Sequence, residues 1–297
     1  MKLLSKSRKK RKESIDGWLF MLPVVILTLV FFIYPAIRAF YLSFFRYSII
    51  STNPKFIGLY NYIALFYDNV FWRALLNTFL YAVVVVAVQL VIALMLALIA
   101  NTKIRGKEFY RTAYYIPTLT SSVALVIIFI FLFKQNGVFN ALIGLFGIQP
   151  ITFFGNPLLA LPGVMMMAIW ASTGLYMIIF LGGLQGIPRS LYEAAEIDGA
   201  SKWQQLLNVT IPQLKPTIFF NLVVSIIGCL QIFDLAFIVS GGNGGPLNST
   251  MTVVLYIYNT GFKSFHMGYA SAMAFVLFMI ILILTLISKR LFKEETG

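Results

Sequence analysis

Six stretches of this sequence are long, apolar and almost free of charge, and they constrain its fold more than any other feature. They run over Trp18–Ile37, Ala74–Ala100, Thr112–Phe133, Leu158–Leu184, Thr217–Ser240 and Met267–Ser288, and Asp234 is the only charged residue in them. A helix needs about 20 apolar residues to cross a bilayer. The alternating segments of a membrane β-barrel are not present. The sequence therefore predicts an all-α integral membrane protein with about six transmembrane helices.

The basic residues are unevenly distributed between the segments that connect these stretches. The net charge is +13, and 17 of the 23 lysines and arginines lie in residues 1–16, 101–111, 185–216 and 289–297. Cytoplasmic segments of membrane proteins carry this excess of positive charge. The pattern predicts a multi-pass protein of the cytoplasmic membrane with both termini in the cytoplasm. It also explains the basic charge without a nucleic acid partner.

Several kinds of catalytic and metal chemistry are excluded by residue content. Cys229 and His266 are the only cysteine and the only histidine, so neither an internal disulfide nor a zinc site of the usual kind can form. Gly106-Lys107 is followed by Glu108 and lacks the preceding glycine of a Walker A motif. We expect no catalytic residue, no metal site and no cofactor in this chain, which is then a transport subunit and not an enzyme.

Residues 185–216 predict two short helices on the cytoplasmic surface. Ser190 and Glu193 have the spacing of a capping box, and Gly199 suits the position just after a helix. A second capping box, Ser201 to Gln204, predicts another helix that ends before Pro212. On these features alone, an ordinary interfacial loop and a docking site for a partner are equally supported.

The sequence from Glu193 to Ala200, Glu-Ala-Ala-Glu-Ile-Asp-Gly-Ala, followed by Ile211-Pro212, resembles the EAA loop of ABC importer permeases. The longer stretch from Leu184 to Pro216 is similar to the carbohydrate-uptake branch, the maltose- and glycerol-phosphate-type permeases. Two further stretches agree with that branch, namely residues 140–157 and Phe233-Asp234 followed by the glycine-rich run at 241–246. That run is longer than the compact turn expected of the family. The resemblance covers roughly residues 72–290.

The resemblance implies a type I ABC importer fold with a pair of coupling helices that dock on a separate ATPase. The residues to which it assigns this coupling are Glu193, Ala194, Ala195, Asp198, Gly199, Ile211 and Pro212. It implies four partners or partner types: a second permease, ATPase subunits that bind ATP and Mg, an extracytoplasmic sugar-binding protein and the lipid bilayer. The expected organisation is an N-terminal part (1–71), a permease core (72–291) with its coupling loop at 185–216, and a cytoplasmic tail (292–297).

The fifth apolar stretch supplies the candidates for a substrate path. Asp234 is a charged residue in a predicted span, where such residues are often functional. A structural role, bonded to a neighbouring helix or to the glycine-rich run, is slightly favoured for it. Asn221 and Gln231 are polar residues of the same stretch. Gln89 and Asn77 are weaker candidates, because such amides commonly join membrane helices.

The function that these features favour is the pore-forming permease of an ATP-driven sugar importer. The alternative is an ion-coupled secondary carrier, a class that often shows internal repeats and several intramembrane charges. Neither feature is evident in the sequence. The sequence identifies no particular sugar and no aromatic residue that would stack on one.

Overall fold

The computed structural model describes residues 17–50, 53–102 and 106–293. Within these residues, six helical stretches are long and apolar enough to cross a membrane, namely Gly17–Leu42, Asn69–Asn101, Ser122–Gly144, Ala160–Gln185, Lys202–Ser240 and Met267–Phe292. The predicted all-α membrane fold is confirmed. Contacts divide the chain into two units, Met1–Leu65 with Thr260–Phe275, and Phe66–Asn259 with Val276–Gly297. The predicted organisation into 1–71, 72–291 and 292–297 stays a prediction.

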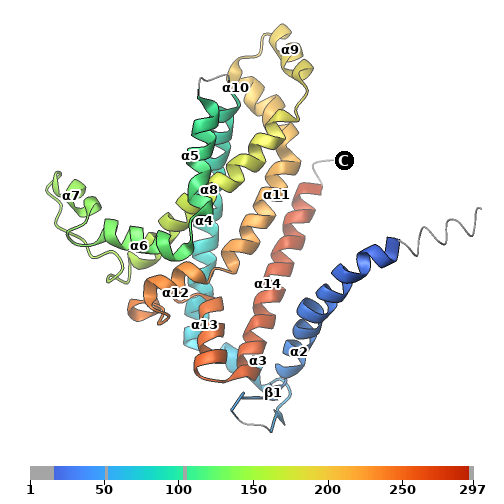
Figure 1. The fold of residues 1–297 in the computed structure, drawn as a ribbon, viewed down its shortest axis with the longest axis vertical. Helices are drawn as coiled ribbons and strands as arrows, with labels where there is room; N and C mark the ends of the chain where they lie inside the picture. Colours follow the sequence, from blue (N-terminus) through green and yellow to red (C-terminus); the bar gives the residue numbers. More distant parts are fainter. Residues whose placement is uncertain (1–16, 51–52, 103–105, 294–297) are drawn as a thin grey trace, which may run out of the picture. The chain divides into compact units, whose positions relative to one another are not determined.

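The first unit contains the N-terminal span and a small hairpin (Figure 1). Its described helix starts at residue 17, passes through a π-helical turn η1 (Leu29–Ile33) and continues as α2 (Tyr34–Leu42). Strands β1 (Phe45–Arg46) and β2 (Lys55–Phe56) pair antiparallel, and α3 (Tyr60–Phe66) follows them. A Cβ atom at Gly268 would lie 1.9 Å from the carbonyl oxygen of Phe45, so the hairpin requires glycine there.

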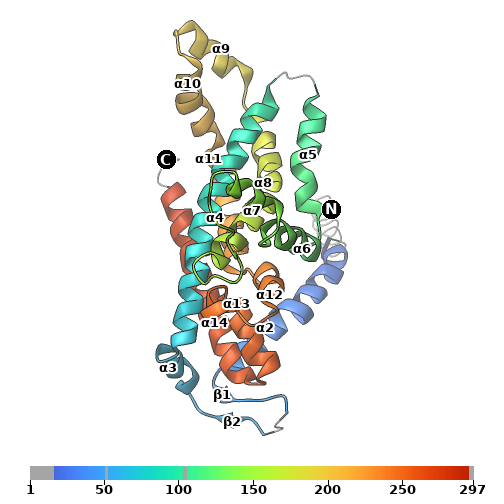
Figure 2. The ribbon, with the colours of Figure 1, turned by 90° about the vertical axis from the view of Figure 1, so that its left-hand side faces the viewer.

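The second unit is built on three helices that run side by side: α4 (Asn69–Asn101), α8 (Ala160–Gln185) and α11 (Ile211–Leu230). Figure 1 and Figure 2 show α8 packed against one part of α4, while the N-terminal part of α4 extends beyond α8. Buried apolar side chains fill the space between α4, α8 and α11, including Val85, Val164 and Leu230. The remaining helices of this unit are α5 (Lys107–Leu119), α6 (Ser122–Phe133), α7 (Val138–Gly144), α9 (Arg189–Ile197), α10 (Lys202–Gln205), α12 (Asp234–Ser240), η3 (Pro246–Asn248) and α13 (Val253–Tyr258). Three of the described helices cross the division between the units: α3, η4 (Asn259–Lys263) and the last span, α14 (Met267–Lys293).

The third predicted span is not one helix, and here the sequence prediction is wrong. Helix α5 ends at Leu119, Thr120 is extended with ψ 136°, and α6 begins at Ser122 and runs at an angle to α5 (Figure 1). Pro117 lies one turn from the break, and the hydroxyl of Thr118 donates to the carbonyl of Ala171 on α8 at 2.9 Å. Hydroxyl side chains form hydrogen bonds with backbone groups and so compete with the helical pattern. Helix α5 therefore ends at Leu119, although the sequence beyond it is still apolar.

The fifth predicted span is interrupted in its second half, which is another correction. Helix α11 ends at Leu230, and α12 starts at Asp234 and packs against α6 and α8. It ends at Ser240 as expected, because Gly241 and Gly242 both have positive φ. The chain then folds back onto α4, where the Asn77 amide donates to the carbonyls of Asn248 and Met251 at 2.9 and 3.0 Å.

Two neighbouring glycines of α8 have opposite environments, which allows a matched test of the packing. A Cβ atom at Gly183 would lie 2.5 Å from Oγ1 of Thr217 and 2.9 Å from Cδ2 of Leu214, both on α11, whereas one at Gly182 meets nothing within 4 Å. Gly183→Ala should destabilise the purified protein by about 1–3 kcal/mol through overpacking. Gly182→Ala should leave it unchanged or raise its stability by about 0.5–1 kcal/mol through helix propensity. Thermal unfolding in detergent measures both. Equal midpoints for the two variants would contradict the close approach of α8 and α11.

Candidate functional site

The loop between α8 and α11 begins with the short helix α9, whose start differs from the prediction. Pro188, with ψ 131°, occupies the cap position, Arg189 is the first helical residue, and Ser190 lies inside the first turn. A capping serine must lie outside the helix, so the predicted box of Ser190 and Glu193 is wrong. Glu193 instead pairs with Arg189 one turn earlier, at 3.1 Å. The charge of Glu193 therefore lies on the exposed side of α9.

The end of α9 agrees with the sequence prediction. Gly199 has φ +76°, its N–H donates to the carbonyl of Glu196 at 3.1 Å, and the N–H of Ala200 donates to the carbonyl of Ala195 at 2.9 Å. This pair of bonds is a Schellman motif, which requires a left-handed residue after the helix. Gly199 therefore fixes the direction in which the chain leaves α9.

The second predicted helix starts as expected and does not end as expected. Ser201 Oγ accepts from the N–H of Gln204, and Gln204 Oε1 accepts from the N–H of Ser201 at 2.7 Å, so this capping box is confirmed. Helix α10 then continues through the π-helical turn η2 (Leu206–Thr210) into α11. Pro212 has no N–H to donate, and a wide turn just before it accommodates the proline. The loop thus contains one short helix, α9, and the first turns of a long one.

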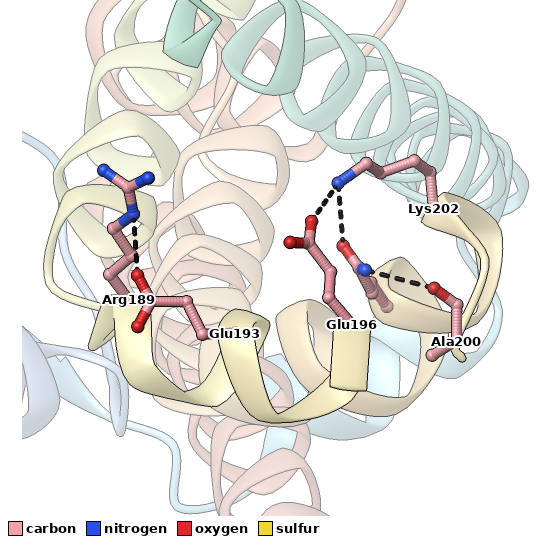
Figure 3. A network of polar contacts seen from close by, with 6 residues as sticks. Arg189, Glu193, Glu196, Ala200 and Lys202 are labelled. Atoms are coloured by element: carbon pink, nitrogen blue, oxygen red, sulfur yellow. Dashed lines mark hydrogen bonds and ion pairs between the residues drawn. The ribbon is translucent and has the colours of Figure 1, made fainter. Parts of the chain in front are cut away.

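Side-chain contacts fix α9 against the start of this long helix (Figure 3). Lys202 Nζ lies 2.6 Å from Glu196 Oε1 and 3.4 Å from Gln205 Oε1, while Gln205 Nε2 donates to the carbonyl of Ala200 at 3.1 Å. Tyr192 Oη lies 2.9 Å from Thr210 Oγ1. Exposed ion pairs contribute little stability, so these contacts mainly define an angle between α9 and α10.

Large apolar side chains are exposed beside these contacts. Ile197, Trp203 and Leu207 have 87%, 67% and 44% of their surface exposed. Clustered exposed apolar residues are typical of interaction sites. The sequence analysis did not single them out, although a tryptophan two residues after a capping serine could have been noticed. The predicted coupling residues Ala194 and Asp198 are exposed on the same helix and its cap.

The structure separates the three predicted substrate-path residues. Asn221 is fully buried between α11 and α8, where its Nδ2 lies 3.5 Å from the carbonyl oxygen of Tyr176. Gln231 and Asp234 flank the interruption of the fifth span, and both are exposed. Among the described residues, no cluster of histidine, cysteine and acidic side chains could hold a metal ion.

A cavity of about 640 Å³ lies between α4, α5 and α8. Its lining is mainly apolar and aromatic, with Tyr110, Tyr114 and Trp170 among the lining residues. The sequence features considered above do not predict this cavity.

Comparison with known proteins identifies the family. Residues 62–294 match the family of binding-protein-dependent transport system inner membrane components. The chain belongs to this family. It is therefore a permease subunit of an ABC importer, and the ion-coupled carrier left open by the sequence has no support. The permease is 41% identical to the probable ABC transporter permease protein YesP of Bacillus subtilis, with 99% of this chain and 94% of YesP covered.

Two other matches agree with this assignment. The permease is 39% identical to the lactose transport system permease protein LacF of Rhizobium radiobacter, with 96% of each chain covered. A chain in the crystal structure of a bacterial ABC transporter that imports the acidic polysaccharide alginate has the same fold. Its TM-score is 0.85 at 23% identity, with 98% of the permease and all of that chain covered. The predicted type I importer fold is thereby confirmed.

The ion pair between Lys202 and Glu196 can be tested by titration. The hydrogen bond from Lys202 is the largest cause that lowers the pKa of Glu196, its positive charge acts in the same direction, and Arg189 has the smallest effect. Because the folded-state pKa is lowered, the pair stabilises the loop above the ordinary carboxylate pKa. This stabilisation is lost as the pH falls through the folded-state value. Lys202→Met should raise the pKa of Glu196 towards its ordinary value, and Arg189→Met should raise it much less. Carboxyl-carbon NMR on the purified permease measures both, and equal shifts in the two variants would contradict the assignment.

Proposed function

We propose that this permease forms the path through which an ATP-driven importer moves a sugar or oligosaccharide across the cytoplasmic membrane. The supporting observation is the loop at 185–216, where a short rigid helix with exposed apolar neighbours lies between two helices of the core. LacF, a lactose transport permease by name, is similar over nearly its whole length, which supports a carbohydrate substrate. The partners are a second permease, cytoplasmic ATPase subunits and an extracytoplasmic sugar-binding protein.

In this proposal the chain supplies no cofactor and no catalytic residue, and ATP and Mg bind to the partner ATPase. Purification of the permease with its native partners tests the proposal directly. ATP hydrolysis by the reconstituted complex should rise when the binding protein and the transported sugar are added, with lactose as the first of a panel of sugars. A complex without an ATPase subunit would contradict the proposal, as would one whose hydrolysis responds to none of the sugars.

We further propose that α9 and the turn after it dock on the ATPase. Glu193, Ala194 and Ala195 lie on α9, and Asp198 with Gly199 forms the turn. Ile211 and Pro212 would act differently, because they lie at the start of α11 after the π-helical turn. They hold α10 in line with α11. A displacement of the docked helix is then passed to the fifth span through continuous helix.

Substitution of Gly199 tests this docking role. A side chain there meets open space, so only the positive φ opposes substitution, at about 1–2 kcal/mol for an ordinary residue. Gly199→Val should lower sugar-stimulated ATP hydrolysis roughly fivefold to thirtyfold, the change in population that 1–2 kcal/mol produces. Gly199→Asn should retain most of the activity, since asparagine tolerates this conformation. Equal activities of the two variants at equal protein level would refute the role assigned to the turn.

We propose that Gln231 and Asp234 face the substrate path, because both are exposed where the fifth span is interrupted. Interrupted helices are where transporters commonly bind their substrates. Asp234→Asn keeps the shape of the side chain and removes its charge. Since a hydrogen bond to a charged group contributes about 1.5–3 kcal/mol, uptake should fall roughly tenfold or more while the complex still assembles. Loss of the assembled complex would indicate a structural role instead, and unchanged uptake would exclude both roles.

The orientation of the permease is also a proposal, based on the excess of basic residues in alternate segments. Single cysteines can test it in a Cys229→Ala background. An impermeant thiol reagent on intact cells should label Gln149→Cys, at an exposed position of the loop at 134–157, and should not label Ser201→Cys until the membrane is opened. The opposite pattern would reverse the orientation of the permease and place the loop at 185–216 outside.

A further inference from the structure

Gln89 is a polar side chain of α4 that lies inside the apolar core. It has 1% of its surface exposed. Its Nε2 donates to the hydroxyl of Ser225 on α11, and its Oε1 accepts from the hydroxyl of Ser172 on α8. One amide group thus uses both its donor and its acceptor to join three helices that are distant in sequence. The docking proposal above makes no use of this group.

The surroundings of Gln89 are mainly apolar, apart from the thiol of Cys229 beside the amide and the hydroxyl of Tyr176 beside Ser225. One cluster of buried residues lies before it on α4 and includes Val85 and Val86, and another lies after it and includes Ala93 and Ala97. Apolar packing tolerates small changes of register, whereas a buried polar pair is satisfied in one arrangement only. An amide at this position costs desolvation unless it is bonded. Its two bonds therefore specify how α4, α8 and α11 are aligned.

Another polar contact between α8 and α11 is much weaker. Asn221 Nδ2 lies 3.5 Å from the carbonyl of Tyr176, at the limit of a hydrogen bond. Within the described part of the chain, Asn221 Oδ1 is buried and finds no partner. Tyr176 on α8 also lies within hydrogen-bonding range of Ser225 on α11. The particular contribution of Gln89 is therefore that it binds both α8 and α11 to α4.

The position of these two helices in the chain gives the contact its importance. Helix α8 leads into α9, and α11 continues from α10 through η2. They are thus the two helices through which any force on the loop at 185–216 enters the core. Gln89 lies on a third helix and binds both of them.

We propose that Gln89 is a positioning residue that couples the loop to transport by making α4, α8 and α11 move as one body. The proposal rests on the proposed function, because it takes α9 as the docking site of the ATPase. Without the amide, α8 and α11 are no longer tied to α4 and can shift relative to it. The ATPase would then still hydrolyse ATP, but less sugar would be imported for each ATP hydrolysed.

The alignment can be measured without any sugar. Spin labels at Ile178→Cys on α8 and Phe220→Cys on α11 would be placed in a Cys229→Ala background, since both side chains are exposed, at 40% and 54%. Electron–electron resonance on the purified complex gives the distribution of the distance between the labels. Gln89→Met, which has a similar shape and no hydrogen-bonding amide, should broaden this distribution. A distribution as narrow as that of the unsubstituted core would overturn the proposal.

The coupling is measured as sugar imported per ATP hydrolysed in proteoliposomes, with the sugar that most stimulates the unsubstituted complex. Gln89→Met should lower this ratio severalfold while ATP hydrolysis persists. The variant Gln89→Met/Ser172→Ala/Ser225→Ala also removes the two hydroxyls that bond the amide and leaves an apolar contact between the three helices, so it should restore protein level but not the ratio. Recovery of both would show a merely structural role and overturn the proposal.

Thr78→Val serves as the matched control on the same helix. The Thr78 hydroxyl accepts from the N–H of Val253 at 3.0 Å and has no bond to α8 or α11. Its loss should lower protein level and leave the ratio of sugar to ATP unchanged. An equal fall of the ratio in Thr78→Val and Gln89→Met would refute a specific role for Gln89. If the unsubstituted complex shows no sugar-stimulated hydrolysis, the proposed function fails. A normal ratio in Gln89→Met, with stimulated hydrolysis intact, refutes only the positioning role.

Discussion

A polypeptide inside hydrocarbon must satisfy its backbone N–H and C=O groups within the protein, because no water is present to do so. At the interruption of the fifth span, a side chain from another segment satisfies a free backbone group. Where the fifth span stops between Leu230 and Asp234, the hydroxyl of Thr252 donates to the carbonyl of Ile232 at 3.0 Å. The glycine-rich segment that carries Thr252 back to this point is held in turn by Asn77. The break is therefore built by residues on three separated segments, and its geometry is specified rather than loose.

Two prolines, Pro35 and Pro212, are accommodated by a second device. Pro35 and Pro212 each lie two residues beyond a π-helical turn, η1 and η2. In both cases the residue before the proline donates five residues back, Tyr34 to Leu29 and Ile211 to Leu206. The widened turn lets the helix continue past a residue that cannot donate. In the loop at 185–216, this continuity joins α10 to the fifth span without a break, so the two form one continuous helix.

Local chemistry explains which parts of this arrangement the sequence could predict. Apolar length alone located the six spans, and the Schellman glycine and the capping box at Ser201 follow from residues within a few positions of each other. The box at Ser190 was misread because Pro188 takes the cap position first. The interruptions at Thr120 and Gln231 lie inside runs that remain apolar, so hydropathy cannot show them. They depend on partners such as Ala171 and Thr252, which only the folded chain brings near.

Gln89 also shows what the sequence can and cannot predict. The sequence marks it as a polar residue of a kind that joins helices, but its two partners are 83 and 136 residues away along the chain. These two partners, Ser172 on α8 and Ser225 on α11, are the basis of the positioning role proposed for Gln89. Rigid connection at the loop would have no effect on the path if α8 and α11 could slide past each other in the apolar core. Conversely, if α9 were a flexible loop, a movement of the docked ATPase would not be transmitted to the core, however rigid the core is. In the proposed mechanism the Schellman turn, the continuous α10–α11 helix and the Gln89 bridge are therefore parts of one connection, and a weak part cannot be compensated by strengthening another.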